Sequence, residues 1–323
     1  MPEKLTVMRR LGQFLLLALL FGLAPVAHAS EKLVVPFEQD EYDRLIVELT
    51  FSDKVTRRGV VDSAATMPLI SEPTARAVGV AEVPPGTERF VTILGLGGPE
   101  VFPLRDIPRL SAGNVGLRDV PVALDKRIAV DGVLNVFPAS ILDGDVLDFD
   151  FDKGYLSAYD SRPAGPNRNI LSRQPLRIRD GLFFIDVEIN GVKGQALIDT
   201  GSSITYMNSR FAEASNTRTN ERKTEELLGI TGEDFDVRMA RVSRLEVGKL
   251  NLARLDLLVS DPLLFEYLGL SDEPVMVLGM DFITNFRMQI DRKNGRVYFR
   301  SREGTQKNCL ICSDILNRAS RLD

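Results

Sequence analysis

Two stretches of this chain place an aspartate where acid–base chemistry is possible. Residues 199–203 read Asp-Thr-Gly-Ser-Ser and follow the apolar run 196–198. A weaker copy lies 137 positions upstream, where Asp62-Ser63-Ala64 follows two valines. Two carboxyl groups held close together share one proton, so one can accept a proton from water while the other donates a proton to a carbonyl oxygen. Asp199 and Asp62 are therefore the candidate catalytic pair.

The other side chains that hydrolases commonly use are scarce. The sequence has 1 histidine, His28, and it lies in a segment that we expect to be removed. A mature chain without histidine has no Ser-His-Asp or Cys-His nucleophile and no zinc site built on imidazole. Cys309 and Cys312, in an exported protein, suggest a possible disulfide rather than a redox centre. We expect no metal and no cofactor.

Residues 1–29 have the pattern of a signal peptide. A basic start precedes an apolar run from Phe14 to Val26, and residues 27–29 supply a small-x-small cleavage pattern. The run is shorter than the roughly 20 residues that span a bilayer, although an uncleaved anchor is the alternative. We therefore expect an exported protein, periplasmic or secreted, that begins at Ser30. The whole chain carries a net charge of −5 and residues 1–29 contribute +2, so the mature chain carries −7 and no nucleic-acid partner is expected.

The mature chain reads as two copies of one β-rich unit. In the second copy, the expected strands 183–189 and 192–198 flank Asn190-Gly191, a strong hairpin turn. Later landmarks keep the same order, since 117–124 matches 252–259, Val133-Leu134-Asn135 matches 277–279, and 147–150 matches 288–291. We predict a first unit over 31–160, a linker over 161–175, a second unit over 176–300 and a tail over 301–323. Short helices are expected over 138–142, 209–214 and 281–286.

Residues 196–203, together with Val277-Leu278-Gly279-Met280-Asp281-Phe282, resemble the retropepsin-like and pepsin-like aspartic proteases, in a tandem, single-chain bacterial form. The resemblance implies an all-β fold of two homologous retropepsin-like β-barrel units packed as a pseudo-twofold bilobal protein. It implies an endopeptidase with a polypeptide substrate, in which Asp199 and Asp62 activate water. Gly279 would brace the second aspartate turn, and the hydroxyls of Thr200 and Ser63 would bond across to the opposite turn. Gly201, Ser202 and Ala64 complete the expected support of the pair.

Two glycine-rich segments are candidate flaps that close over bound peptide. The first comprises Gly95, Leu96, Gly97 and Gly98, and the second includes Gly229 and Ile230. Ordinary surface hairpins are the alternative interpretation.

The first unit departs from the family pattern at two positions. Ala64 and Asn135 stand where the second unit has glycine, and an alanine would be strained if its turn required a positive φ. Three arrangements follow: Asp62 pairs with Asp199 in one two-lobed monomer, the first unit is a degenerate lobe of an inactive peptide-binding or scaffolding protein, or two chains form a homodimer through their second units.

Overall fold

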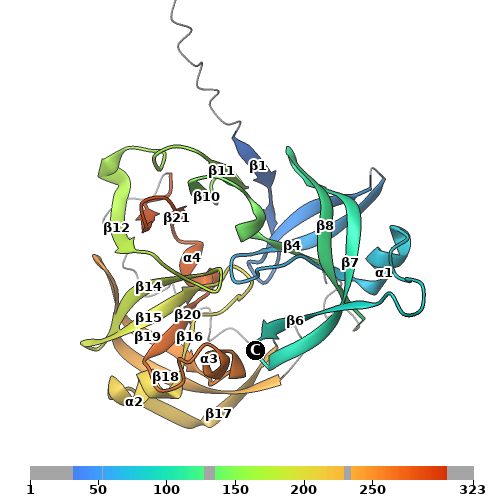
Figure 1. The fold of residues 1–323 in the computed structure, drawn as a ribbon. Helices are drawn as coiled ribbons and strands as arrows, with labels where there is room; N and C mark the ends of the chain where they lie inside the picture. Colours follow the sequence, from blue (N-terminus) through green and yellow to red (C-terminus); the bar gives the residue numbers. More distant parts are fainter. Residues whose placement is uncertain (1–31, 53, 127–134, 229–233, 304–323) are drawn as a thin grey trace, which may run out of the picture. The chain divides into compact units, whose positions relative to one another are not determined.

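The chain folds into β-strands with a few short helices (Figure 1). The computed structural model describes residues 32–52, 54–126, 135–228 and 234–303. The predicted signal peptide, residues 1–29, and the cysteines Cys309 and Cys312 lie outside the described residues. The predicted all-β class is correct. Within the described ranges, no helix is long and apolar enough to cross a membrane.

The first eight-stranded sheet is built from residues 38–138. Its strand order is β2-β3-β4-β9-β5-β8-β7-β6, and β3 also pairs with β7. The strands are β2 (Glu38–Gln39), β3 (Leu45–Phe51), β4 (Val55–Asp62), β5 (Leu69–Ser71), β6 (Arg89–Gly95), β7 (Gly98–Ala112), β8 (Val115–Asp125) and β9 (Val136–Pro138).

The second eight-stranded sheet repeats this arrangement. Its order is β13-β14-β15-β20-β16-β19-β18-β17, and β14 also pairs with β18. The strands are β13 (Arg177–Arg179), β14 (Leu182–Ile189), β15 (Val192–Ile198), β16 (Tyr206–Met207), β17 (Arg218–Leu228), β18 (Asp234–Val247), β19 (Leu250–Val259) and β20 (Val275–Leu278). Asn190 and Gly191 both have positive φ, 50° and 88°, as a two-residue hairpin between twisted strands requires.

A six-stranded sheet joins strands from both halves of the chain. Its order is β1-β11-β10-β21-β22-β12, made of β1 (Leu33–Pro36), β10 (Val146–Asp150), β11 (Tyr155–Tyr159), β12 (Ile170–Pro175), β21 (Arg287–Asp291) and β22 (Arg296–Arg300). Where β10 meets β21, Asp148 lies opposite Gln289. The buried carboxylate of Asp148 is 2.6 Å from Nη2 of Arg287 and accepts a bond from Gln289. Part of the expected linker 161–175 thus belongs to this sheet as β12, and the sequence did not indicate that sheet.

The helices are short and lie between strands. They are α1 (Glu72–Ala77), η1 (Ala139–Ile141), η2 (Asn167–Asn169), α2 (Ser209–Ala214), α3 (Leu263–Tyr267) and α4 (Met280–Ile283). α2 has the predicted bounds, because Asn208 caps it by accepting a bond from the N–H of Phe211. η1 and α4 are shorter than predicted, and α1 and α3 were not predicted.

The described residues belong to one compact unit, held by a core that crosses the sheets. The largest group of buried apolar side chains includes members of all three sheets, such as Phe51, Phe149 and Ile198. Burial of this surface is the main force that holds both aspartate-bearing strands in place.

Candidate active site

Asp62 and Asp199 occupy equivalent places in the two repeated sheets. Asp62 is the last residue of β4, and Asp199 directly follows β15. Each strand has a parallel neighbour, β9 and β20, beside its carboxyl end. The two side chains are nearly buried, with Asp62 7% and Asp199 9% exposed. The repeated topology therefore delivers two carboxyl groups to matching positions.

Each aspartate is fixed by backbone N–H groups of its own turn. Oδ1 of Asp62 accepts bonds from Ala64 at 2.6 Å and Ala65 at 3.1 Å. Oδ1 of Asp199 accepts bonds from Gly201 at 2.8 Å and Ser202 at 3.1 Å. The two turns share one hydrogen-bond pattern although their sequences differ.

The hydroxyls of Ser63 and Thr200 connect the two turns. Oγ1 of Thr200 accepts from the N–H of Ser63 at 3.0 Å and donates to the carbonyl of Val61 at 2.9 Å. Oγ of Ser63 accepts from the N–H of Thr200 at 3.0 Å and donates to the carbonyl of Ile198 at 2.8 Å. Both side chains are fully buried. Four reciprocal bonds thus hold the aspartate turns against each other within one chain.

The two carboxyl groups are hydrogen-bonded to each other. Burial raises the pKa of both, and the negative charge of Asp62 raises the pKa of Asp199 further. The bond between them lowers the pKa of Asp62 and raises that of Asp199. The pair therefore titrates in two steps that belong to both carboxyl groups, and between these steps it holds one shared proton.

Gly201 allows the partner carboxylate to approach closely. A Cβ at position 201 would lie 2.6 Å from Oδ2 of Asp62. Neither Gly201 nor Ala64 has a positive φ. The backbone strain that the sequence suggested for Ala64 is therefore absent. The constraint at position 201 is the lack of room for a side chain beside Asp62, not the backbone conformation. The methyl group of Ala64 packs beside apolar side chains of the second unit.

Gly279 packs against the back of the second aspartate turn. A Cβ at this position would lie 2.5 Å from the backbone of Ile204. The N–H of Gly279 donates to Oγ1 of Thr205 at 3.0 Å, and the N–H of Asp199 donates to the carbonyl of Leu278 at 3.1 Å. Ser202 adds a bond from its hydroxyl to the carbonyl of Ile204 at 2.9 Å.

The buried carboxyl group of Asp281 completes this support, and the sequence reasoning did not assign it a role. It accepts bonds from Oγ1 and from the N–H of Thr205, at 2.5 and 3.1 Å. Burial raises its pKa to about 6, although these bonds oppose the shift. The sequence did contain an indication of this role, because Asp281 belongs to the motif 277–282 that resembles the aspartic proteases.

The strand register corrects one part of the repeat. Val61 lies beside Phe137, whereas the equivalent Ile198 lies beside Leu278. The counterpart of residues 277–279 is therefore 136–138, three residues later than the predicted match at 133–135. Pro138, not Asn135, occupies the place of Gly279. The side chain of Asn135 instead bonds Arg58 and Ser71, which links β4 to β5.

The first glycine-rich segment forms the tip of the β6–β7 hairpin. Gly95 pairs with Gly98, and the tip residue Leu96 accepts a bond from the N–H of Leu264 in α3 at 3.3 Å. Figure 1 shows β6 beside α3. A Cβ at Gly98 would lie 3.5 Å from Cβ of Leu263. Gly97 lies with Leu96 in the tip, whereas the second candidate flap, Gly229 and Ile230, is outside the described residues.

The hairpin tip also packs on an apolar cluster of the second unit. This Tyr206 cluster consists of Leu182, Phe184, Leu197, Tyr206, Leu258, Leu264, Phe265, Leu270, Val275 and Val277. Leu94 and Leu96 of the hairpin and Ala64 of the aspartate turn pack against it. The hydroxyl of Tyr206 is buried without a hydrogen-bond partner among the described residues. Burial and the charge of Asp199 raise its pKa, so this hydroxyl stays protonated.

Comparison with known families agrees with the geometry of the second unit. Residues 185–282 match the family model of aspartyl proteases. This match includes Asp199, Gly279 and Asp281, and it supports an aspartic protease relationship. No curated protein matches the chain. Among solved structures, the aspartic proteinase from Irpex lacteus is similar, with 13% identity over 86% of this chain and 99% of the other and a TM-score of 0.49.

The described residues offer no evident site for a metal ion. Within them, no group of three or more His, Cys, Asp or Glu side chains is arranged to hold one.

Proposed function

We propose that this protein is an aspartic endopeptidase in which one chain supplies both catalytic aspartates. The observation that carries the proposal is the pair of hydrogen-bonded carboxyl groups of Asp62 and Asp199, in two turns joined by the reciprocal bonds of Ser63 and Thr200. The family match over residues 185–282 supports the same class of reaction.

A pair that shares one proton supplies one ionised and one protonated carboxyl group, and in this proposal Asp62 is the ionised member. Ionised Asp62 accepts a proton from a water molecule, and the oxygen of that water attacks the peptide carbonyl carbon. Protonated Asp199 donates its proton to the carbonyl oxygen. The C–N bond of the resulting diol then breaks as Asp62 gives its proton to the leaving nitrogen, and one hydroxyl of the diol gives its proton to Asp199 as the carboxylic acid forms. The pair again holds one proton, as at the start.

The β6–β7 hairpin acts as a flap in this proposal. Its tip contacts α3 and the Tyr206 cluster, and both aspartates are at most 9% exposed. A polypeptide substrate therefore needs the tip to move away from α3 before it reaches the pair. Closure over the bound peptide then excludes bulk water from the reaction.

The signal-peptide pattern of residues 1–29 supports export, to the periplasm or the exterior. The contacts between Asp62-Ser63 and Asp199-Thr200 within one chain favour a two-lobed monomer over a homodimer of second units. An inactive peptide-binding protein on the same fold is the alternative.

Cleavage of denatured casein tests the proposal. The purified mature protein is incubated from about pH 3 to pH 8, with and without pepstatin, beside an Asp199→Asn variant. We expect pepstatin-sensitive cleavage by the wild type and none by the variant. Absence of cleavage by the wild type, with peptide binding retained, would favour the binding protein.

A further inference from the structure

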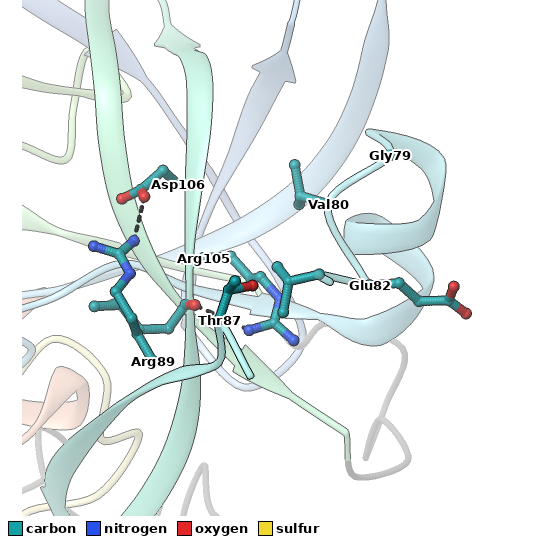
Figure 2. A pocket seen from close by; sticks show the side chains of 9 residues that line it. Gly79, Val80, Glu82, Thr87, Arg89, Arg105 and Asp106 are labelled. Atoms are coloured by element: carbon teal, nitrogen blue, oxygen red, sulfur yellow. Dashed lines mark hydrogen bonds and ion pairs between the residues drawn. The ribbon is translucent and has the colours of Figure 1, made fainter. Parts of the chain in front are cut away.

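A second candidate site lies at the base of the β6–β7 hairpin, away from the aspartates. It is a cavity of about 310 Å³ between the segment after α1, the start of β6 and the middle of β7. Gly79, Thr87, Arg89 and Arg105 are among the residues that line it (Figure 2). Arg89 pairs with Leu104 in the hairpin, so the cavity adjoins the end of the hairpin opposite to its tip. Its volume suits a small ligand.

Arg105 is a buried cation without an anionic partner. Its side chain is 7% exposed, yet no described carboxylate forms an ion pair with it. Its Nη1 donates to the carbonyl of Leu104 at 3.0 Å, and its Nη2 donates to the carbonyl of Ala81 at 3.2 Å. Its Nε is buried and has no acceptor in the part of the chain that the structure describes. Buried charges are ordinarily paired, because removing an ion from water is costly.

The acidic residues near the cavity do not neutralise Arg105. Asp106 forms its ion pair with Arg89 instead. Figure 2 shows the side chain of Glu82 directed away from Arg105. The guanidinium group of Arg105 therefore lines the cavity with no carboxylate among the described residues to neutralise its charge.

We propose that this cavity binds a small oxyanion, a carboxylate or a phosphate group, through Arg105. A guanidinium group offers paired N–H donors that match the two oxygens of either group. Arg89 also lines the wall, where its charge is paired with that of Asp106. The hydroxyl of Thr87 donates to the carbonyl of Pro84 at 2.7 Å, so its lone pairs are available to a protonated oxygen of the ligand. This site is independent of the proposed peptidase activity.

The binding of inorganic phosphate and of malonate to the full mature protein tests the proposal. Melting temperature and calorimetric titration are measured against sodium chloride at equal ionic strength. We expect saturable binding at one site and a rise in melting temperature of about 2 °C or more. Tighter malonate binding would indicate a carboxylate ligand, and tighter phosphate binding a phosphate ester. Binding of neither would overturn the proposal.

Three variants identify the residue responsible. Arg105→Met is expected to abolish the saturable binding and to raise the melting temperature without ligand, because an unpaired buried charge is removed. Arg89→Met, a change at an exposed side chain, should weaken binding about 3- to 10-fold, as the loss of one nearby charge predicts. Arg76→Met, at an exposed side chain of α1, should leave the affinity unchanged.

An equal rise in melting temperature on adding the anion to wild type and to Arg105→Met would mean general salt stabilisation, and would overturn the proposal. If Arg105→Met does not fold, unchanged affinity in Arg89→Met would overturn it.

Discussion

A methyl group on Gly201 would lie 2.6 Å from Oδ2 of Asp62, the aspartate of the opposite turn. Asp62 has little freedom to move away, because Ala64 and Ala65 hold its Oδ1. The carboxylate of Asp62 can therefore occupy its position only because residue 201 of the opposite turn is a glycine. The first turn tolerates Ala64 at the matching position, so the two halves of the site are similar but not equivalent.

Gly201→Ala should displace the carboxylate of Asp62 and lower kcat about 100-fold or more, since a shift of 1 Å at a reacting group has such an effect. Peptide cleavage under saturating substrate measures it. Ala64→Gly is the matched control and should stay within about tenfold of the wild type, because Ala64 shows no backbone strain. Wild-type kcat in Gly201→Ala would contradict the proposed geometry.

Thr200→Ala should destabilise the fold, because it leaves the N–H of Ser63 and the carbonyl of Val61 buried without partners. We expect a loss of about 1–3 kcal/mol in the free energy of unfolding, measured with urea. Thr200→Ser retains the hydroxyl and should lose less. Combining Thr200→Ala with Ser63→Ala should cost less than the sum of the two single changes, since their bonds form one network. Strict additivity would argue against that coupling.

A disulfide between positions 98 and 263 should lock the hairpin tip onto α3. A Cβ at Gly98 would lie 3.5 Å from Cβ of Leu263, which is within the range for a disulfide. In a background with Cys309→Ser and Cys312→Ser, oxidised Gly98→Cys/Leu263→Cys should be inactive and should recover on reduction. Because φ at Gly98 is 102°, the single variant Gly98→Cys controls for backbone strain. Full activity of the oxidised protein would show that the tip need not open.

Asp281→Asn should flatten the dependence of stability on pH. Burial raises the folded-state pKa of Asp281 from 3.8 to about 6, so the folded state holds a proton that the unfolded state releases. The contribution of Asp281 to stability is thus fully present below pH 4 and falls as the pH rises to 6, by roughly 3 kcal/mol. Urea unfolding at pH 4, 5 and 6 measures it. An identical slope in the variant would contradict the raised pKa.

The sequence predicted the parts of the fold that depend on local pattern. Short segments rich in apolar residues predicted β3, β4, β14 and β15, and Asn190-Gly191 predicted a hairpin whose two turn residues have positive φ. The resemblance to aspartic proteases implied that Ser63 and Thr200 would bond across to the opposite turns. The four hydrogen bonds between the two turns have this arrangement.

Features that depend on long-range pairing were not predictable in this way. The match of Asn135 with Gly279 rested on similar apolar residues, but pairing of Val61 with Phe137 fixes a register three residues later. The contact of Leu96 with α3 joins residues 168 positions apart in sequence, and no local pattern indicates it. The burial of Arg105 could not be predicted either, because β7 has many exposed residues and an arginine in such a strand is ordinarily expected to face solvent.

The most direct test of the central claim, that one chain supplies both catalytic carboxylates, is the kcat of Asp62→Asn on a peptide substrate. We expect a loss of about 100-fold or more, because Asp62 is the group that accepts the proton of water in the proposed mechanism. Circular dichroism and melting temperature confirm that the variant is folded. Wild-type kcat in this variant would show that Asp62 is not needed, and would assign the activity to Asp199 in a homodimer of second units.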